Sequence, residues 1–586
     1  MNYQLISPIQ TQSITEQLFY NRGFSNREDI LHYLNLTEDD DLGFEGIEEN
    51  LEAGLKMLVK HLRLKSKIFI QVDPDVDGYT SAAILINYLY RLFPDTISQN
   101  VHYRIQDGKE HGLILDTINT DIYKLVIAPD SSSNDYEVHK ALAEKGVDVL
   151  VIDHHNAEKI SEYACVINNQ LCNYKNKTLS GAGVVYKFCR FIDKVKGTNV
   201  AKDFVDLAAL GIISDMMDIR DFETRYFIDL GLNNIFNRFF HEMTVQNSYS
   251  LKDKITPNGV AFYITPYINA CIRTGTPEEK LTMFEAMLDF KGEEKIPSTK
   301  RGEKGLYETR ITQACRNCKN AKNRQKNSQD RAAETIEEII VNNNLNDNKI
   351  LLIQLDETME IDKNLTGLIA NKLMSKYQKP VLLLRKTNRD GVLKWEGSGR
   401  GYTKSGFEDF QGYLKNLNLF EYVDGHENAF GRGIVDENIE EFISVSNNML
   451  KDFDFTPKHN VDFIFDSNGL KASAIEEIAN LEHLWGQGMT EPVIAIKNIK
   501  VKNDSLFLLK GTTLKFSTET SDGKKIEFIK FGSNQDEYDR LKSDSPNGYT
   551  SVDIVGKCSI NTYMGLSTPQ IKLEDYEIKR SFAYDF

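Results

Sequence analysis

Carboxylate and imidazole side chains stand at the ends of several apolar runs in the first half of the chain. Three acids follow the run 67–72, and Gly78 then permits a tight turn. The complete set is Asp73, Asp75, Asp77, Asp130, Asp153, His154, His155 and Asp215. If these groups converge, their mutual repulsion requires cations to neutralise it. Carboxylates and imidazoles without thiolate suit Mn²⁺ or Mg²⁺ better than structural zinc, and they suffice for two ions about 3.5–4 Å apart that assist attack at phosphorus.

Simpler explanations exist for each group taken alone. A single Asp after a strand is usually a helix cap, and an adjacent pair of histidines is more often structural than ligating. The segment 73–78 also resembles the start of a calcium loop, but Ile84 stands at the twelfth position, where such loops carry Glu. The occurrence of all these groups in order, at successive run ends, favours a site for two metal ions.

The apolar runs indicate strands that alternate with helices. Strands are expected at 67–72, 125–128 and 147–152, and the run 207–214 is expected to be a further strand that ends at Asp215. Such alternation predicts parallel βαβ units, in which ligands bind at the carboxyl ends of the strands. The acids should therefore share one rim of a sheet.

The expected fold class is α/β, with two α/β domains joined by a long helix and a C-terminal β-barrel. Residues 1–66 are expected to form a helical segment packed on a catalytic domain over 67–240. A helical connector over 241–345 includes the long linking helix, and 281–345 contain no strand-like run. A second α/β domain follows over 346–456, and short strands with many turns over 457–586 predict the barrel.

The composition excludes several classes of protein. With 41% apolar and 27% charged residues, the chain is neither disordered, collagenous nor a coiled coil. No apolar run reaches the roughly 18 residues needed to span a bilayer, and no secretion signal is recognised, so a cytoplasmic protein that does not enter the membrane is expected. Seven cysteines, an odd number, do not form a disulfide framework. The net charge of −16 argues against a general polyanion binder unless bases are concentrated locally.

Two segments do concentrate bases. Residues 300–331 contain ten Lys or Arg against three acids, and this stretch either lines the path of a nucleic acid strand or is a solvated linker helix. The tail interleaves lysines with Phe507, Phe516 and Phe528, which suits stacking of single-strand bases, although alternating Phe is as often core. Cys315 and Cys318 have no second cysteine pair, and no role is assigned to them.

Four segments, 75–81, Asp130, 153–155 and Asp215, resemble the four motifs of the DHH phosphoesterases. Other segments resemble the RecJ-like single-strand-specific 5′→3′ exonucleases within that family, namely 103–104, 111–113, 179–187, 206–217 and 268–273. The second domain is similar to the DHH-associated domain at 397–401 and 425–431. The tail resembles the RecJ oligonucleotide-binding (OB) barrel at 484–492 and 552–555, so the resemblance covers nearly the whole chain.

The resemblance implies a role for each candidate residue. The metal ligands would be Asp75, Asp77, Asp130, His154 and Asp215, with Asp73 a ligand or an adjacent acid. His155 would contact the scissile phosphate, and Asp153 would orient the histidines. Asn269 and Arg273 would grip backbone phosphate. Arg104, Ser398 and Arg400 would form the pocket for the terminal 5′-phosphate, and His426 would line the same cleft.

The resemblance therefore implies a metal-dependent 5′→3′ exonuclease that hydrolyses single-stranded DNA to 5′-mononucleotides by a two-metal mechanism in DNA repair, recombination or replication. Its substrate would be single-stranded DNA with a 5′ end, its protein partners a single-strand-binding protein or a helicase, and the chain would act as a monomer. Two alternatives remain open: a DHH phosphodiesterase for short oligonucleotides or cyclic dinucleotides, and a non-catalytic helicase-associated replication scaffold. The connector and tail favour a long polymer, and the presence of every motif acid disfavours the scaffold.

Overall fold

The computed structural model describes residues 1–586 except 9, 10, 12, 109, 253, 304, 357, 358, 360, 362–364, 390, 391, 543–547, 564 and 580–586. The chain forms two compact units. We call Phe24–Asn323 with Glu482–Glu491 the N-unit. The C-unit comprises Met1–Gly23, Arg324–Leu481 and Pro492–Phe586. Within the described part of the chain, no helix combines the length and the apolar character that crossing a bilayer requires.

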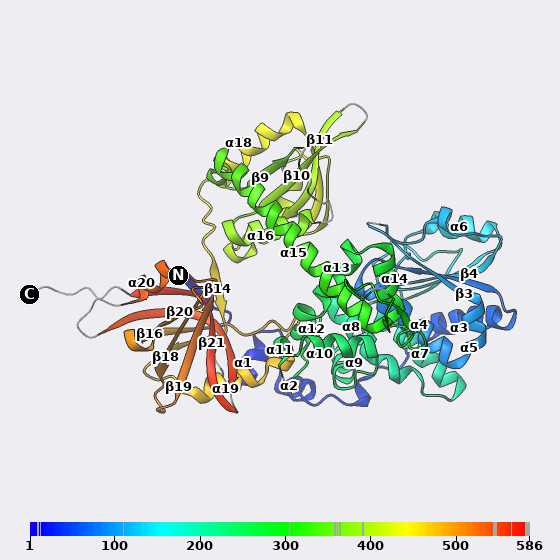
Figure 1. Cartoon of the computed structure of the whole chain (residues 1–586), viewed down its shortest axis with the longest axis horizontal. Coiled ribbons are helices and arrows are strands. Elements are labelled where there is room, and N and C mark those ends of the chain that lie inside the picture. The colour runs from blue at the N-terminus through cyan, green and yellow to red at the C-terminus, as the bar shows by residue number, and fades with distance from the viewer. Residues whose placement is uncertain are drawn as a thin grey trace, which may run out of the picture. The chain divides into compact units, whose positions relative to one another are not determined.

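A five-stranded parallel sheet forms the centre of the N-unit (Figure 1). Its strands, in spatial order, are β3 (Val101–Ile105), β2 (Lys67–Val72), β4 (Tyr123–Pro129), β5 (Asp148–Asp153) and β6 (Cys165–Asn168). The parallel pairing agrees with the predicted alternation of strands and helices. Because the strand order reverses direction at β2, the sheet has a topological switch point between β2 and β4, and ligands bind at the carboxyl ends beside such a point.

Helices cover both faces of this sheet. α3 (Glu48–Arg63), α4 (Val76–Leu92) and α7 (Gly181–Lys196) contact it on one side, and α6 (Tyr136–Glu144) on the other. The α6 face encloses a core to which alternate residues of the strands contribute, such as Val126 and Ala128 of β4. The remaining helices of the N-unit are α2 (Arg27–Tyr33), α5 (Pro94–Asn100), α8 (Val205–Ser214), α9 (Phe222–Asn233), α10 (Arg238–Gln246), α11 (Ser248–Leu251), α12 (Pro257–Tyr263), α13 (Thr265–Thr274) and α14 (Pro277–Ala286).

The run 207–214, expected to be a strand, is part of helix α8. Every residue from Val205 to Ile213 is buried, and α8 packs against α4, α7 and α9. A helix buried on all sides carries apolar residues on all sides, so a short apolar run does not distinguish it from a buried strand. The prediction of a strand was wrong, although Asp215 does follow the run as its C-terminal cap.

The connector also departs from its expected all-helical character. β7 (Lys295–Pro297) and β8 (Tyr307–Thr309) form a short antiparallel pair that the sequence did not predict. The expected long helix follows as α15 (Arg310–Asn342), and the boundary between the two units falls within it. Three of the bases in this region are paired within the N-unit: Lys300 with Glu303, Arg310 with Glu285 and Arg316 with Glu308. Lys304 lies outside the described residues.

One sheet of the C-unit is a five-stranded mixed sheet (Figure 1). Its strands, in spatial order, are β12 (Tyr422–His426), β13 (Ala429–Val435), β11 (Val392–Arg400), β10 (Val381–Arg389) and β9 (Leu351–Leu355). Residues of α15 and α16 (Thr366–Tyr377) pack on one face, and α17 (Phe410–Asn416) and α18 (Ile439–Met449) pack on the other.

The other large sheet of the C-unit has seven strands and forms the tail. In spatial order these are β15 (Phe463–Asp466), β16 (Ile494–Lys502), β20 (Tyr549–Tyr563), β21 (Leu566–Lys579), β19 (Lys525–Phe531), β18 (Thr513–Glu519) and β17 (Phe507–Leu509). The helices of this region are α1 (Ile14–Tyr20), α19 (Ala472–Asn480) and α20 (Gln535–Leu541).

The first 23 residues differ from the expected helical segment on the catalytic domain, because they belong to the C-unit. β1 (Asn2–Leu5) pairs in parallel with β14 (Lys458–Val461). Tyr3 and Leu5, two residues apart, pack against a small core of Val461, Ala495 and Val555, as the period of a strand requires.

Candidate metal centre

The turn after β2 supplies the first three acids. Asp75 is the N-cap of α4, and its Oδ1 accepts a hydrogen bond from the Gly78 amide at 2.8 Å. The capping explanation therefore holds for Asp75, but its carboxyl also lies close enough to Asp77 and Asp73 for their charges to raise its pKa. A Cβ at Gly78 would lie 2.6 Å from the Cβ of Asp73, so the turn can close tightly only with glycine there.

Asp130 follows β4 in a strained conformation. Its φ of +67° lies in the left-handed region, which is uncommon for a residue other than glycine and concentrates at functional sites. The side chain is 1% exposed, and a Cβ on Gly181 would lie only 2.2 Å from its Oδ1. The backbone thus holds the Asp130 carboxylate inward against the first turn of α7.

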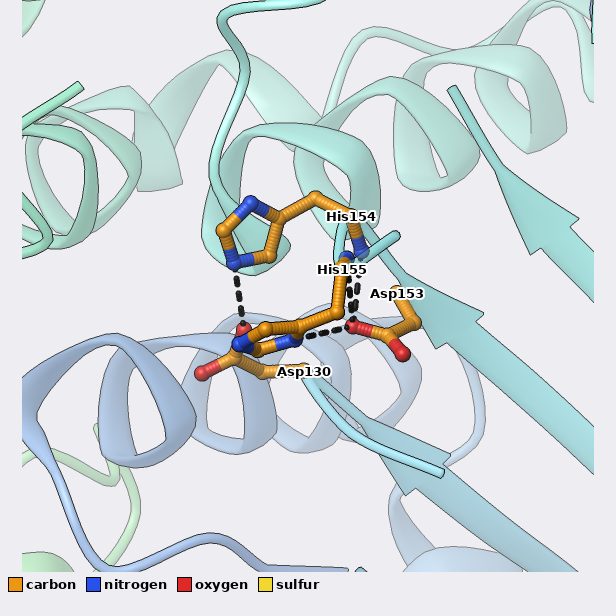
Figure 2. A group of neighbouring side chains, drawn as sticks. All are labelled: Asp130, Asp153, His154 and His155. Atoms are coloured by element: carbon orange, nitrogen blue, oxygen red, sulfur yellow. Dashed lines mark hydrogen bonds and ion pairs between the residues drawn. The ribbon is translucent and has the colours of Figure 1, made fainter. Parts of the chain in front are cut away.

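The imidazole of His154 lies at the centre of the acids. Its Nε2 is 3.2 Å from Asp130 Oδ1, 3.5 Å from Asp215 Oδ2 and 3.7 Å from Asp77 Oδ2. Figure 2 shows this ring turned toward Asp130, while the His155 ring turns toward Asp153. Two overlapping sets of potential ligand atoms result: Asp77, His154 and Asp215, and Asp130, Asp153, His154 and His155.

Asp77 is oriented by the start of α7. Ser180 Oγ donates to Asp77 Oδ1 at 2.8 Å, and the amides of Gly181 and Ala182 donate at 2.7 and 3.1 Å. Amides at a helix N-terminus favour a negative charge, so they hold Asp77 as an oriented carboxylate. Sequence reasoning quoted the segment 179–187 but assigned it no role, although its Ser-Gly-Ala-Gly pattern was the available signal.

The acids of this cluster retain protons more strongly than ordinary carboxyl groups. Burial, reinforced by Asp77, raises the pKa of Asp75 to about 6 and that of Asp215 to about 8. The same causes raise the pKa of Asp130 well above its usual value. Burial lowers the pKa of His154, so its imidazole is neutral at neutral pH. A neutral imidazole cannot balance the charge of these carboxylates.

In the neighbouring pair Asp153 and His155, both side chains favour their charged forms. His155 Nδ1 and Asp153 Oδ1 are 2.8 Å apart, and this hydrogen bond raises the pKa of His155 to about 9. Burial opposes ionisation of Asp153, but the hydrogen bond and charge of His155 outweigh it, and the pKa of Asp153 lies well below its usual range. The pair therefore places an imidazolium, 44% exposed, beside the cluster.

The donor set fits divalent cations. Asp130 Oδ1 and His154 Nε2 are buried and make no hydrogen bond to any described residue, although only 3.2 Å separates them. Buried polar atoms normally make a hydrogen bond. A carboxylate oxygen and an imidazole nitrogen that face each other without one therefore indicate that a binding partner belongs between them. Carboxylate oxygens with one imidazole nitrogen are the donors that Mn²⁺ and Mg²⁺ take in proteins.

Comparison with known proteins decides the family. Residues 67–212 match the DHH family, N-terminal domain, and residues 461–575 match the RecJ OB domain. The chain is 38% identical over 567 residues to YorK of Bacillus subtilis strain 168, a candidate single-strand DNA-specific exonuclease of the SPbeta prophage; this covers 96% of the chain and 95% of YorK. The chain belongs to the RecJ-like exonucleases of the DHH family.

More distant relatives agree with the fold. The single-stranded-DNA-specific exonuclease RecJ of Bacillus subtilis is 23% identical over 612 residues, which cover 100% of the chain and 72% of that protein. The crystal structure of RecJ in complex with Mn²⁺ from Thermus thermophilus matches with a TM-score of 0.68 at 18% identity, over 97% of this chain and 76% of that one. The Mg²⁺ complex of the same protein matches with a TM-score of 0.62. The chain thus has a DHH domain, a DHH-associated region and an OB domain, as the sequence predicted.

A third histidine joins the DHH site: His111, which lies in a segment that resembles the family but to which the sequence assigned no role. His111 Nδ1 is 2.9 Å from Asp73 Oδ2, and the ring centroids of His111 and His155 are 5.6 Å apart. The hydrogen bond to Asp73 raises the pKa of His111. Asp73 is thereby tied to a loop, which favours its role as an adjacent acid. Neither Asp73 nor Asp75 belongs to either set of ligand atoms.

The remaining candidate residues lie on other elements. In the N-unit, Asn269 and Arg273 stand one turn apart on α13, whose Thr265 Oγ1 lies 3.0 Å from the Oγ of Ser214, the neighbour of Asp215. Arg104 is on β3. In the C-unit, Ser398 Oγ lies 3.0 Å from Thr366 Oγ1.

The candidate residues of the C-unit sit on the mixed sheet. Arg400 ends β11 and donates through Nη1 to the Gly399 carbonyl. His426 ends β12 and is exposed.

The tail aromatics divide into core and surface. Phe516 and Phe528 are buried and stack on each other with centroids 4.7 Å apart, so the suggestion that they stack on bases was wrong. Phe507 is 52% exposed, as stacking requires, and Phe531, which the sequence did not single out, is 64% exposed. All seven cysteines are free, and Cys315 and Cys318 are buried on α15.

Proposed function

We propose that this chain is a metal-dependent exonuclease that hydrolyses single-stranded DNA from a 5′ end and releases 5′-mononucleotides. The observation that carries the proposal is the cluster around His154, in which three carboxylates surround a neutral imidazole within 3.7 Å. The relatives support the substrate, because YorK and RecJ are both described as acting on single-stranded DNA.

Two divalent ions are the proposed cofactors, Mn²⁺ or Mg²⁺. Four of the residues that would hold them belong to the two sets of ligand atoms: Asp77, Asp130, His154 and Asp215. Asp75, whose carboxyl interacts with Asp77, is the fifth proposed ligand, and Asp73 lies beside it. When bound, such ions supply a nucleophilic water at neutral pH and neutralise charge on the phosphate. The amides at the start of α7 orient Asp77 for this task, and the strained Asp130 is held in place by β4 and Gly181.

Charged groups around the cluster are proposed to handle the scissile phosphate. His155 carries a positive charge at neutral pH, and Asp153 fixes its ring, so His155 can stabilise developing charge on the non-bridging oxygens. Asn269 and Arg273 on α13 would hold the phosphate backbone.

Recognition of a terminal 5′-phosphate would set the direction of cleavage. Arg104 in the N-unit is the proposed phosphate-binding residue there. In the C-unit, Ser398, Arg400 and His426 are the proposed substrate-binding residues. A guanidinium matches the geometry of phosphate oxygens.

The test is digestion of single strands labelled at the 3′ end, carrying either a 5′-phosphate or a 5′-hydroxyl, with Mn²⁺ and with Mg²⁺. We expect the labelled strand to shorten progressively from the 5′ end, while unlabelled 5′-mononucleotides accumulate and are detected by chromatography of the total products. Products that shorten from the 3′ end, or internal fragments, would contradict the direction. Faster degradation of dinucleotides or cyclic dinucleotides than of long strands would favour the small-substrate phosphodiesterase instead.

A variant that carries both Asp75→Ala and Asp130→Ala separates catalysis from binding. We expect hydrolysis to be abolished and single-strand affinity to be largely kept, because these acids serve the ions rather than the strand. Undiminished cleavage would remove the assignment of the site. Absence of hydrolysis in the unaltered chain with either metal would favour a replication scaffold. A cytoplasmic location, a monomeric state and a helicase or single-strand-binding protein as partner stay predictions.

A further inference from the structure

The guanidinium of Arg104 already has an anionic partner. Its Nη2 donates to both carboxylate oxygens of Glu110, at 2.7 and 3.0 Å. The side chains are 28% and 32% exposed, so the pair is partly shielded from water. Any phosphate that binds Arg104 must therefore compete with the Glu110 carboxylate.

One terminal nitrogen of the Arg104 guanidinium lacks a hydrogen bond to any described residue in this arrangement. This nitrogen, Nη1, is buried. An unsatisfied buried donor is unfavourable, and both Glu110 oxygens are engaged with the other nitrogen. A ligand with more acceptor oxygens and more charge than a carboxylate would satisfy the guanidinium better.

Glu110 is also held in place by its own loop. Its Oε2 accepts a hydrogen bond from the Asp107 amide at 3.0 Å, and Asp107 forms an ion pair with Lys280, a residue that is 5% exposed. On the other side, His111 is bound to Asp73 at 2.9 Å. Because the loop is tied on both sides of Glu110, the carboxylate is held in position to compete with a ligand for Arg104.

We propose that Glu110 is a specificity-determining residue that restricts Arg104 to terminal phosphates. A phosphate monoester at a 5′ end carries a charge of about −1.5 to −2 at neutral pH and has three free oxygens. An internal phosphodiester carries a single charge, equal to that of Glu110, and gains little by displacing it. Glu110 thus lets a terminal 5′-phosphate bind Arg104 and keeps the internal phosphates of the strand from binding there. This inference rests on the proposed role of Arg104 in the exonuclease.

The test is Glu110→Gln, which removes the charge and keeps the shape of the side chain. The kcat/KM of the full chain with Mn²⁺ is measured on strands of one sequence with a 5′-phosphate or a 5′-hydroxyl. Removal of one competing charge at hydrogen-bond distance should raise the rate on the 5′-hydroxyl strand about tenfold, and change the rate on the 5′-phosphate strand less. The affinities of the two strands are measured by fluorescence anisotropy without added metal. The difference in affinity between the 5′-phosphate strand and the 5′-hydroxyl strand should become smaller in Glu110→Gln.

Asp203→Asn is the matched control, because Asp203 pairs with Arg91 at 2.9 Å in the same unit and has no place in the site. It should leave the preference for 5′-phosphate unchanged. The inference is overturned if Glu110→Gln leaves the preference intact, or if it slows both strands, which would make Glu110 an orienting residue for Arg104.

Arg104→Met separates this inference from the proposed function. Loss of the preference in Arg104→Met, together with an unchanged preference in Glu110→Gln, overturns the inference and leaves the proposed function standing. An unaltered chain that shows no preference, and an Arg104→Met variant that behaves like it, would overturn the role of Arg104 and this inference with it.

Discussion

Individual acids of the centre depend on their surroundings for their charge. Asp75, Asp130 and Asp215 are raised in pKa by burial and by one another, whereas Asp153 is kept ionised by His155. Two kinds of carboxyl group therefore lie in the same cluster. Three of them need an added cation to ionise, and Asp153 is paired with a cationic side chain of the protein, His155. Because of this difference, the binding of metal depends on pH, and the effect of pH on stability depends on whether metal is bound.

The contribution of Asp75 and Asp215 to stability without metal should fall as the pH rises. The folded pKa values of Asp75 and Asp215, about 6 and about 8, exceed the roughly 3.9 of an unfolded Asp, so the folded state binds more protons. Their contribution is fully present below about pH 4 and is lost as the pH rises through about 6 and then about 8. The folded pKa of His155, about 9, exceeds the roughly 6.5 of an unfolded His, so its contribution to stability is also lost as the pH rises from about 6.5 to about 9.

Melting temperatures in EDTA and in Mn²⁺, from pH 5 to pH 8.5, measure this effect. We expect Mn²⁺ to raise the melting temperature more at pH 8 than at pH 5, since ionised ligands bind the ion. Asp215→Asn should flatten the dependence on pH in EDTA. A stabilisation by Mn²⁺ that does not change over this range would contradict the assignment of these acids as ligands.

Arg432 is a second residue whose charge is poorly matched to its place. It lies on β13, is 0% exposed, and none of its guanidinium nitrogens makes a hydrogen bond to a described residue. Its guanidinium carbon lies 6.0 Å from the centroid of the Phe420 ring. Burial lowers its pKa well below the ordinary value. An uncompensated buried charge is strongly unfavourable.

Arg432→Met should therefore stabilise the chain. We expect a gain of about 1–4 kcal/mol in the free energy of unfolding, the range found when buried ion pairs are replaced by apolar residues of similar size. Urea unfolding of the two proteins measures it. Arg400→Met, which replaces a half-buried arginine of the neighbouring strand, is the matched control and should give no such gain. A destabilised Arg432→Met would indicate that the guanidinium has a partner.

At the scale of elements, the centre depends on close contact between α4, α7, α8 and the loop after β4. Glycines make this contact possible. A Cβ on Gly181 of α7 would lie 2.2 Å from Asp130 Oδ1, and one on Gly211 of α8 would lie 2.4 Å from Asp77 Oδ1. The two glycines thus let α7 approach the carboxylate in the loop after β4 and let α8 approach the carboxylate in the first turn of α4.

Gly181→Ala should impair the centre without harming its helix. Alanine is the better helix former by about 0.5–1 kcal/mol, so any loss must come from displacement of Asp130. We expect kcat to fall at least about a hundredfold, since small misplacements of catalytic groups have effects of this size. Gly469→Ala is the control, because a Cβ there meets nothing within 4 Å. A fully active Gly181→Ala would contradict the described position of Asp130.

The elements also indicate what the sequence could and could not predict. Asp73, Asp130 and Asp153 were placed together correctly because parallel strands bring their carboxyl ends to one edge. The helical nature of 205–214 could not be read from a run that is apolar on every side. The contact of His111 with Asp73 depends on where the loop after β3 returns, which no local pattern specifies.

At the scale of the whole molecule, an acidic chain must hold a polyanion. The net charge of −16 opposes the approach of DNA, so affinity for long strands has to come from local surfaces and from contacts other than charge. The tail sheet offers a candidate for such a surface. Phe507 of β17 pairs in register with Lys515 of β18, and Phe531 of β19 pairs with Thr513, so these positions share one face.

Removing both exposed rings, in a variant that carries Phe507→Ala and Phe531→Ala, should weaken the binding of long strands. Base stacking on an aromatic ring contributes about 1–3 kcal/mol, so we expect the Kd for a long single strand to rise about tenfold or more. The kcat on a strand of a few nucleotides should not change, because the metal centre is intact. Anisotropy and initial rates on strands of increasing length measure the two effects.

Leu566→Ala is the matched control for that variant, since Leu566 is 75% exposed on the same sheet and has no ring to stack. It should leave unchanged both the Kd for a long strand and the kcat on a strand of a few nucleotides. If the loss of affinity in the double variant were equal for short and long strands, the rings would be acting on the metal centre rather than on the distant part of the strand. If affinity were unchanged at every length, the tail would bind DNA by charge alone, and the slope of affinity against salt would then have to account for the whole of its contribution.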